Sequence, residues 1–261
     1  MIATIQEARD AIATTALPAI EAFAADAPAA GGLPDFDAAK EQSVVIGSDV
    51  VSFGTGVDAE FRQAIADSAL FAQLAALNEV GADADPMLFF DAYFRRLMQL
   101  GWLVQQRDTS ELDVKGDGFD VHHAITGVIT AFLAPIAGAA QAVLAVLDGL
   151  YQMNTSAPFI TLFNKRSTRQ KIGRFQFTYV RKGADDGLLA EMAAFGLTAN
   201  EAITQILFFK IHKNRASVRR SLGQLSIPQE TLRGIRAQLA AKVQAYRVSM
   251  IAEADLGPVE A

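Results

Sequence analysis

Carboxylates and imidazoles gather just ahead of the most apolar part of the chain. The group consists of Asp113, Asp117, Asp120, His122 and His123. Such side chains ligate divalent metal ions, and the spacing D-x-K-G-D-G begins like a calcium loop. However, the twelfth position of that loop is Ala124 and not the bidentate Glu that calcium needs. We therefore predict no metal site, and we expect a solvated loop in which Asp120 caps the next helix.

Recognisable catalytic signatures do not occur in this sequence. It contains no G-x-G-x-x-G, no P-loop, no H-E-x-x-H and no G-x-S-x-G. The absence of cysteine excludes thiol catalysis, disulfides and thiolate zinc sites, and only three histidines could serve as bases. We expect a protein that is not an enzyme and that uses no cofactor. An enzyme of an unrecognised class is the least favoured of the three interpretations that we consider.

An uncharged segment directly follows the two histidines. Residues 124–147 contain 24 positions without Asp, Glu, Lys or Arg, and a bilayer core is crossed by about 20 apolar residues. Pro135 and Gly138 divide the segment, so we predict two helices that form an apolar hairpin. Its many small residues, its proline and Gln141 favour a buried helix pair in a large soluble domain, and no basic flank marks a cytoplasmic end. We predict that the hairpin is buried in the soluble state, because it would otherwise expose a large apolar patch.

In general layout, a chain with such a segment resembles helical pore-forming and translocation proteins, an analogy of architecture alone. The resemblance implies that the larger apolar side chains of the hairpin insert into lipid. These side chains are Ile125, Val128, Ile129, Phe132, Leu133, Ile136, Val143, Leu144 and Leu147.

Titratable side chains flank the apolar hairpin on both sides. They are Asp117, Asp120, His122, His123 and Asp148. Carrying charged carboxylates toward hydrocarbon is costly, so we expect acid to favour insertion. Protonated histidines would add positive charge, which helps the approach to an anionic surface but opposes deep burial.

Charge is divided unevenly along the chain. The first 150 residues hold 7 Lys or Arg and 21 Asp or Glu, and the remaining residues hold 16 and 8. Between Asp148 and Asp185 there is no acidic residue. We expect the basic residues there to attract anionic lipid headgroups, at roughly 1 kcal/mol for each one near the surface. They are Lys165, Arg166, Arg169 and Lys171. In the alternative interpretation, the basic half packs against the acidic half of the same molecule.

Periodicity and turn residues predict the order of the elements. We expect helices at 3–26 (interrupted near Pro18), 58–80 and 85–104, the hairpin 124–147, and a closing helix from Pro228. Strands are expected at 43–53, 174–182, 188–197, 202–213 and 216–227, with a loop or short hairpin at 107–120.

Helices, then strands, then a closing helix are typical of an α+β fold. We expect one domain over 1–261, with a mainly helical part at about 1–152 and an antiparallel sheet plus closing helix at about 156–255. The sheet itself should span roughly 158–227. Its Phe175, Phe177 and Tyr179 should face helices, because they alternate with polar residues along one strand.

These observations favour a non-enzymatic protein that interacts with membrane or lipid, such as a toxin-like or virulence-associated pore former. The alternative is a soluble interaction or assembly module whose hairpin is only its core. Nucleic acid is not favoured as a partner, since the aromatics of the basic half fit a core face better than a stacking surface. The oligomeric state stays open. The N-terminus has no basic segment ahead of an apolar one, so we expect a cytoplasmic protein or export without a Sec signal peptide.

Overall fold

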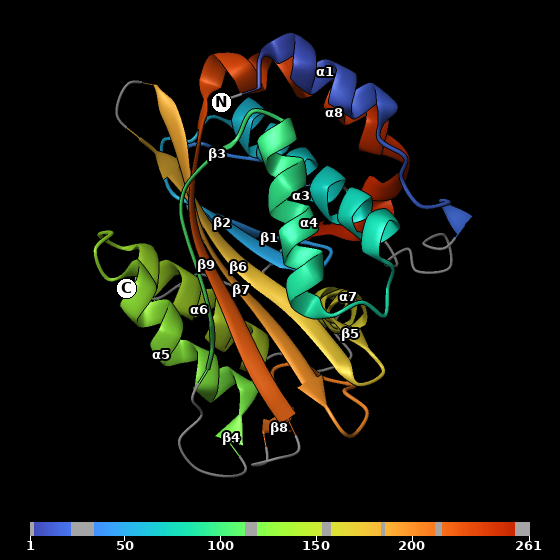
Figure 1. The fold of residues 1–261 in the computed structure, drawn as a ribbon. Coiled ribbons are helices and arrows are strands. Elements are labelled where there is room, and N and C mark those ends of the chain that lie inside the picture. Colours follow the sequence, from blue (N-terminus) through green and yellow to red (C-terminus); the bar gives the residue numbers. More distant parts are fainter. Residues whose placement is uncertain are drawn as a thin grey trace.

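The fold is seen in a computed structural model, which describes residues 3–21, 34–112, 119–152, 158–183, 186–211 and 216–253. Within these ranges a large twisted sheet of eight strands lies between helices on both faces (Figure 1). Across the sheet, the strands are β10 (Ile251–Glu253), β1 (Gln42–Ile46), β2 (Asp49–Phe53), β6 (Ile172–Lys182), β7 (Gly187–Ala199), β9 (Ala216–Pro228) and β3 (Leu103–Glu111). The short β5 (Thr168–Arg169) pairs with β6 beside this path.

Neighbouring strands of the sheet are antiparallel except for one pair. Strand β2 runs parallel to β6, so that Asp49 lies opposite Gln176 and Phe53 opposite Val180. The mostly antiparallel sheet with helices around it confirms the predicted α+β class. The sheet was expected over roughly 158–227, but it also contains β1, β2 and β3 from the mainly helical part of the chain. Of these three strands, β1 and β2 fall in the predicted strand 43–53.

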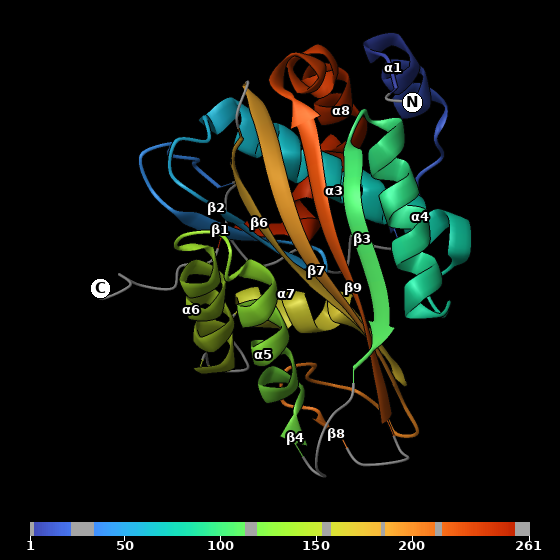
Figure 2. The same ribbon diagram turned by 60° about the vertical axis from the view of Figure 1, so that its left-hand side comes forward.

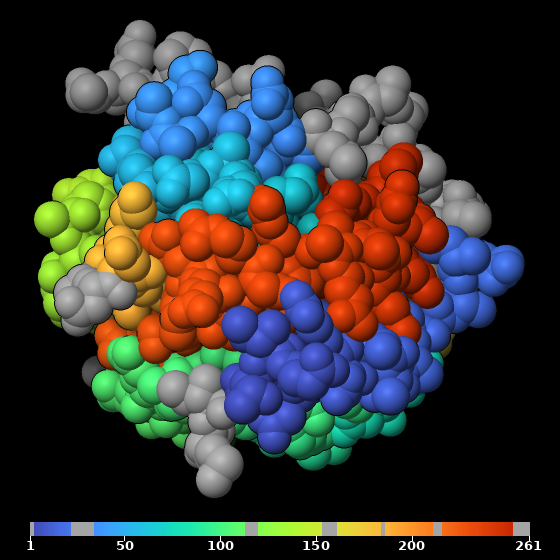
Figure 3. Space-filling model, turned by 90° about the horizontal axis from the view of Figure 1, so that it is seen from above, coloured from blue at the N-terminus to red at the C-terminus, as the bar shows by residue number. Residues whose placement is uncertain are grey.

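The helices form two layers (Figure 2). The first layer contains α1 (Ile5–Thr14), α3 (Ala59–Val80), α4 (Pro86–Gln99) and α8 (Gln229–Met250). From above, α1 lies alongside α8 on the outside of this layer (Figure 3). The second layer contains α5 (Val121–Leu133) and α6 (Ala139–Gln152), with α7 (Pro158–Ser167) beside them. Helix α4 begins as predicted, with the Asp85 carboxylate accepting a hydrogen bond from the Met87 amide at 2.8 Å.

Each layer has its own hydrophobic core against one face of the sheet. Strand β6 shows the division, because its side chains alternate between the two faces. Val180 belongs to the first core, with α3, α4 and α8. Phe175, Phe177 and Tyr179 belong to the second core, with α5, α6 and α7. The prediction that this aromatic face packs against helices is confirmed.

Three predicted elements were wrong in type or extent. Residues 43–53 form two strands and not one, because the chain turns at Gly47 with φ +59°. A side chain there would be strained by the positive φ and would force the Gln73 side chain to move, since a Cβ would lie 2.4 Å from the Gln73 side-chain oxygen. The first helix ends at Thr14, ahead of the interruption expected near Pro18, and the predicted helical residues 22–26 lie outside the described residues. Residues 158–167, expected within the sheet, form α7.

Two further segments differ from the expectation because of how they pack. The polar segment that begins at 107 lies in β3, an edge strand whose side chains are mostly exposed, so it lacks the apolar alternation of a half-buried strand. The apolar segment expected as a strand at 202–213 is described up to residue 211, and within 202–211 only Lys210–Ile211 form a strand, β8, which pairs with β4 (Phe119–Asp120). Ile203, Ile206 and Leu207 instead fill the second core from turns.

Candidate functional site: a helical hairpin and a basic pocket

The predicted apolar hairpin is present as α5 and α6, which meet around Pro135 and Gly138. Six of its predicted inserting side chains are buried in the second core: Ile125, Val128, Ile129, Leu133, Val143 and Leu147. Three are half-buried: Phe132, Ile136 and Leu144. All nine therefore face the protein at least in part, and the hairpin is docked on the sheet.

The outer side of the hairpin is exposed and carries small or weakly polar side chains. They include Gly127, Thr130, Ala131, Ala134, Ala137 and Gln141. No charge interrupts this side between residues 124 and 147. Among the described residues, no helix has both the length and the hydropathy needed to cross a membrane.

Four of the five predicted pH-sensing residues meet at the open end of the hairpin. His122 Nε2 lies 2.8 Å from Asp148 Oδ1, which joins the start of α5 to α6. His123 Nδ1 lies 3.9 Å from Asp120 Oδ2. The fifth residue, Asp117, lies outside the described residues. We call Asp120, His122, His123, Asp148 and Tyr151 the base cluster.

Tyr151 belongs to the base cluster although it was not among the predicted site residues. Its hydroxyl donates to Asp120 Oδ2 at 2.8 Å, and this hydrogen bond raises the pKa of Tyr151. Its ring stacks on His122 at 4.2 Å and on Phe208 at 4.6 Å between centroids. The helical spacing of Tyr151 from Asp148 was the signal that could have placed it on the same end of α6.

Metal binding finds no support in this cluster. Over the ranges that the structure describes, no three His, Asp or Glu side chains are arranged to hold a metal ion.

A groove of about 290 Å³ runs along one flank of α5. Ala131 and Phe132 form its helical side, and side chains of β3 and β9, among them Asp108 and Leu222, form its floor. The hairpin therefore leaves part of the sheet beside it uncovered, and Phe132 borders this space.

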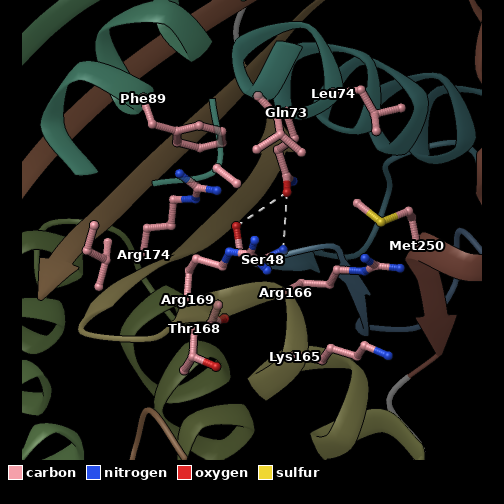
Figure 4. Close-up of a pocket in the computed structure, with 14 residues that line it drawn as sticks. Ser48, Gln73, Leu74, Phe89, Lys165, Arg166, Thr168, Arg169, Arg174 and Met250 are labelled. Carbon is pink, nitrogen blue, oxygen red and sulfur yellow. Dashed lines mark hydrogen bonds between the residues drawn. The ribbon is translucent and has the colours of Figure 1, made fainter. Parts of the chain in front are cut away.

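Three of the four predicted anionic-lipid residues line one pocket, shown in Figure 4. Lys165, Arg166 and Arg169 come from α7 and β5, and the fourth residue, Lys171, lies exposed in the turn before β6. The opposite wall is formed by α3 and the β1–β2 turn, where Ser48 N donates to Gln73 Oε1 at 3.1 Å. The cavity has a volume of about 130 Å³.

Arg174 in β6 adds a cation to this pocket that the sequence did not single out as a site residue. Its guanidinium carbon lies 4.4 Å from the centre of the Phe89 ring, and the side chain is 8% exposed. Burial lowers the pKa of Arg174 to about 10, and Asp83 partly opposes this shift. The alternation along β6 marked Arg174 as a solvent-side residue, whereas the structure buries it on the face toward α4.

A third polar group is buried on the first-layer face of the sheet. Asp49 is fully buried and accepts hydrogen bonds from Gln176 Nε2 at 2.6 Å and Thr178 Oγ1 at 3.0 Å. Tyr93 Oη accepts from the same Gln176 nitrogen at 3.1 Å. Burial raises the pKa of Asp49 to about 7, although both hydrogen bonds oppose the shift.

No protein family and no curated sequence matches this chain. Among solved structures it is similar to a delta-endotoxin, with 13% identity over 70% of this chain and 84% of the other and a TM-score of 0.42. It is also similar to the activated Cyt2Ba monomer from Bacillus thuringiensis subsp. israelensis, with 16% identity over 48% and 71% and a TM-score of 0.29. The Evf virulence factor shows 12% identity over 80% and 85%, with a TM-score of 0.31. Because these TM-scores lie below 0.5, the inferences below rest on this chain's own geometry.

Proposed function

We propose that this chain is a non-enzymatic, toxin-like protein that associates with membranes, and that α5 and α6 leave the sheet to bury their apolar side in lipid. One observation carries the proposal. Within the described residues, no hydrogen bond or ion pair joins a side chain of the hairpin to the large sheet. Apart from the contacts of Tyr151 and His123 with Asp120 in β4, the polar links to the other described elements are backbone ones, from the amides of Val121 and His122 to the carbonyls of Phe209 and Leu207.

Release of the hairpin would expose an apolar stripe that lipid can cover. The uncharged outer side of the hairpin would enter the interfacial region of the membrane together with this stripe. The free-energy cost would be small, since small and weakly polar side chains enter that region more easily than charged ones. Helices of 13 and 14 residues are each about 20 Å long, whereas the hydrocarbon core is about 30 Å thick. We therefore propose that the hairpin first lies in the headgroup region. Permeabilisation by several copies would be a later step.

Acid favours release in this proposal because the polar contacts of the base cluster depend on charge. Protonation of Asp148 and Asp120 removes the carboxylate acceptors of His122 and Tyr151. Protonation of His122 adds an N–H at Nδ1, a buried atom without a hydrogen-bond partner among the described residues. A charged Asp148 opposes this last effect, but weakly, because its side chain is 53% exposed. Lys210 lies opposite Asp120 in the β4–β8 pair, so acid leaves its charge unbalanced.

The approach to the membrane would use the basic side chains near α7. Lys165, Arg169 and Lys171 are exposed, so headgroups can reach them without any conformational change. We expect stronger binding to anionic than to neutral vesicles, and we expect salt to weaken it. Flotation with both vesicle types in low and high salt measures this step.

The cysteine-free chain allows a site-specific test of hairpin insertion. A polarity-sensitive dye on Ala131→Cys reports the outer side of α5, and the same dye on Ala237→Cys reports α8 in the opposite layer; both alanines are exposed. With anionic vesicles in acid, we expect a blue shift from the Ala131 position alone. The double variant Asp120→Asn with Asp148→Asn should move that response toward neutral pH.

Dye release from the same vesicles tests permeabilisation separately. A protein that binds and shifts but releases no contents would be a membrane-binding protein without pore formation. If the label on α5 never responds and the protein does not float with any vesicle, the soluble interaction module takes the place of this proposal.

A further inference from the structure

The pocket between α3, α7 and β6 holds a buried cation, Arg174, for which the described residues supply no hydrogen bond or ion pair. Arg174 is 8% exposed, and its Nη1 atom is buried without a hydrogen-bond partner in the described part of the chain. Arg62 shows how the same fold treats a structural arginine. All three of its nitrogens donate to oxygen atoms, those of Val57, Gln42, Lys40 and Gly54, at 2.8–3.0 Å. An unpaired buried guanidinium is costly, so the difference points to a ligand at Arg174.

The groups around Arg174 add positive charge and a second free donor. Arg169 is close enough to act on the charge of Arg174, and both line the pocket. Ser167 Oγ is buried and also lacks a partner among the described residues, although it lines the same cavity. Among the described residues that line the pocket, none carries a carboxylate. Asp83 lies 3.2 Å from Arg169 Nε in a pair that is more than half exposed and therefore weakly bound.

Lys165 and Arg166 contribute less specifically. They lie in the last turn of α7, where positive side chains stabilise the carbonyl end of the helix. Arg166 Nη2 also donates to the Ser249 carbonyl at 3.2 Å. In Figure 4 the Arg166 side chain extends toward Met250, away from Arg174. The anion site is therefore centred on Arg174, Arg169 and Ser167.

We propose that this pocket binds a phosphoryl group, either free phosphate or the phosphomonoester headgroup of a lipid. Two guanidinium groups and a hydroxyl offer more donors than the two oxygens of a carboxylate can accept, whereas a phosphoryl group presents three or four. The cavity of about 130 Å³ far exceeds the roughly 10–15 Å³ that one water needs. Binding requires neither release of the hairpin nor a membrane, so this site goes beyond the proposed function.

Titration calorimetry of the full chain with inorganic phosphate at low salt tests the site. We expect Arg174→Met to weaken phosphate binding at least tenfold, because the apolar stem is kept and the donors are lost. Arg174→Lys should recover part of the affinity, and Ser167→Ala should lower it a few-fold. The matched control is Arg233→Met, because Arg233 also lies over a phenylalanine ring, at 5.1 Å from that of Phe61, but outside the pocket.

Thermal melting of each variant shows that it folds, so lost binding can be assigned to the pocket. No binding heat with phosphate, or the same affinity in Arg174→Met and Arg233→Met, would overturn the site. Arg174→Met should melt at the natural protein's temperature or above it, since an unpaired charge is removed; a collapse of the fold would instead mark Arg174 as structural. In that case Ser167→Ala decides, because it leaves the cation in place.

Flotation separates the two sources of the phosphoryl group. Phosphatidylcholine vesicles doped with phosphatidic acid present a phosphomonoester, and vesicles doped with phosphatidylglycerol at equal surface charge do not. Preference for phosphatidic acid that Arg174→Met abolishes assigns the site to a lipid headgroup. Equal flotation with both, together with phosphate binding in solution, assigns it to free phosphate. Flotation that does not depend on Arg174, without phosphate binding, supports the proposed function and refutes the pocket.

Discussion

The two helical layers are attached to the same sheet by different kinds of contact. In the first layer, directional polar bonds add to apolar packing. Gln73 of α3 donates to the Ile46 carbonyl of β1 at 2.7 Å, and Gln176 of β6 donates to Tyr93 Oη of α4 at 3.1 Å. In the second layer, the polar side-chain bonds of the hairpin lie within the hairpin. One face of the sheet therefore has an orientation fixed by polar groups, while the other has a cover that can leave without breaking ion pairs.

The largest expected effect is on the first layer. Arg62→Met should destabilise the protein by about 3–5 kcal/mol, because several buried oxygen atoms each lose a hydrogen bond from a charged donor and each such loss costs about 1–3 kcal/mol. The reason is that Arg62 is fully buried, and its loss leaves carbonyl oxygens of the loops around α3 without donors. Urea denaturation measures the change. A loss below about 1 kcal/mol would contradict the view that polar bonds hold this layer.

Asp49 gives the first layer a pH dependence of its own. Its pKa is raised to about 7 in the folded protein and is about 3.9 in an unfolded chain. The folded state therefore binds more protons between these values, and stability falls as pH rises from about 4 to 7. The contribution is on the order of 4 kcal/mol. Asp49→Asn should flatten the stability profile between pH 5 and 8, as followed by urea denaturation at each pH.

An unchanged slope in Asp49→Asn would show that Asp49 does not titrate in this range. If the expectation holds, acid stabilises the first layer, whereas in the proposed function acid loosens the open end of the hairpin. The two layers would then respond to pH in opposite directions.

Hydrogen exchange compares the layers directly. We expect the free energy of opening for amides in α5 and α6 to be at least about 2 kcal/mol lower than for amides in α3 and α8. The reason is that local units with few fixed contacts open before the global transition. Equal protection of both layers would mean that the hairpin opens only on global unfolding, and hairpin release would lose its basis.

The smallest expected effect is that of Asp148→Asn. It should change global stability by less than about 1 kcal/mol, since its pair with His122 is half exposed. Exchange in α5 and α6 should nevertheless accelerate. Asp91→Asn is the matched control: its carboxylate is also half exposed and pairs with Arg107 at 2.7 Å in the first layer. Equal acceleration of the hairpin by both variants would argue against a specific role for the base cluster.

Features that depend on residues close together in the sequence were predictable. The charge-free run with Pro135 and Gly138 specified two short helices, and Asp85 with Pro86 specified the start of α4. Asp120, His122 and Asp148 could be named as flanks of the hairpin, but their meeting follows from the way the two helices fold back on each other.

Features that depend on distant contacts were not predictable. The pocket joins Ser48, Gln73, Ser167 and Arg174 from elements spread over half of the chain, and no local pattern places them together. The alternation of side chains along β6 was predicted correctly. The burial of Arg174 was not predictable, because it depends on α4, which covers that face of the sheet. The apolar pattern of residues 202–209 is compatible with a strand, but these residues form turns because their side chains pack in the second core.

The parallel pairing of β2 with β6 has a consequence for how the chain folds during synthesis. Asp49 in β2 is synthesised long before its partner Gln176 in β6. The strands β7 and β9, which complete the sheet, are synthesised later still. The hairpin is made before any of these strands, so its apolar side has no sheet to cover until roughly 75 more residues have been added, about 4–15 s at ribosomal rates. Such non-local order predicts slow folding and a period of exposure to aggregation. A chaperone or an early membrane contact at this stage would act on the hairpin before the sheet can.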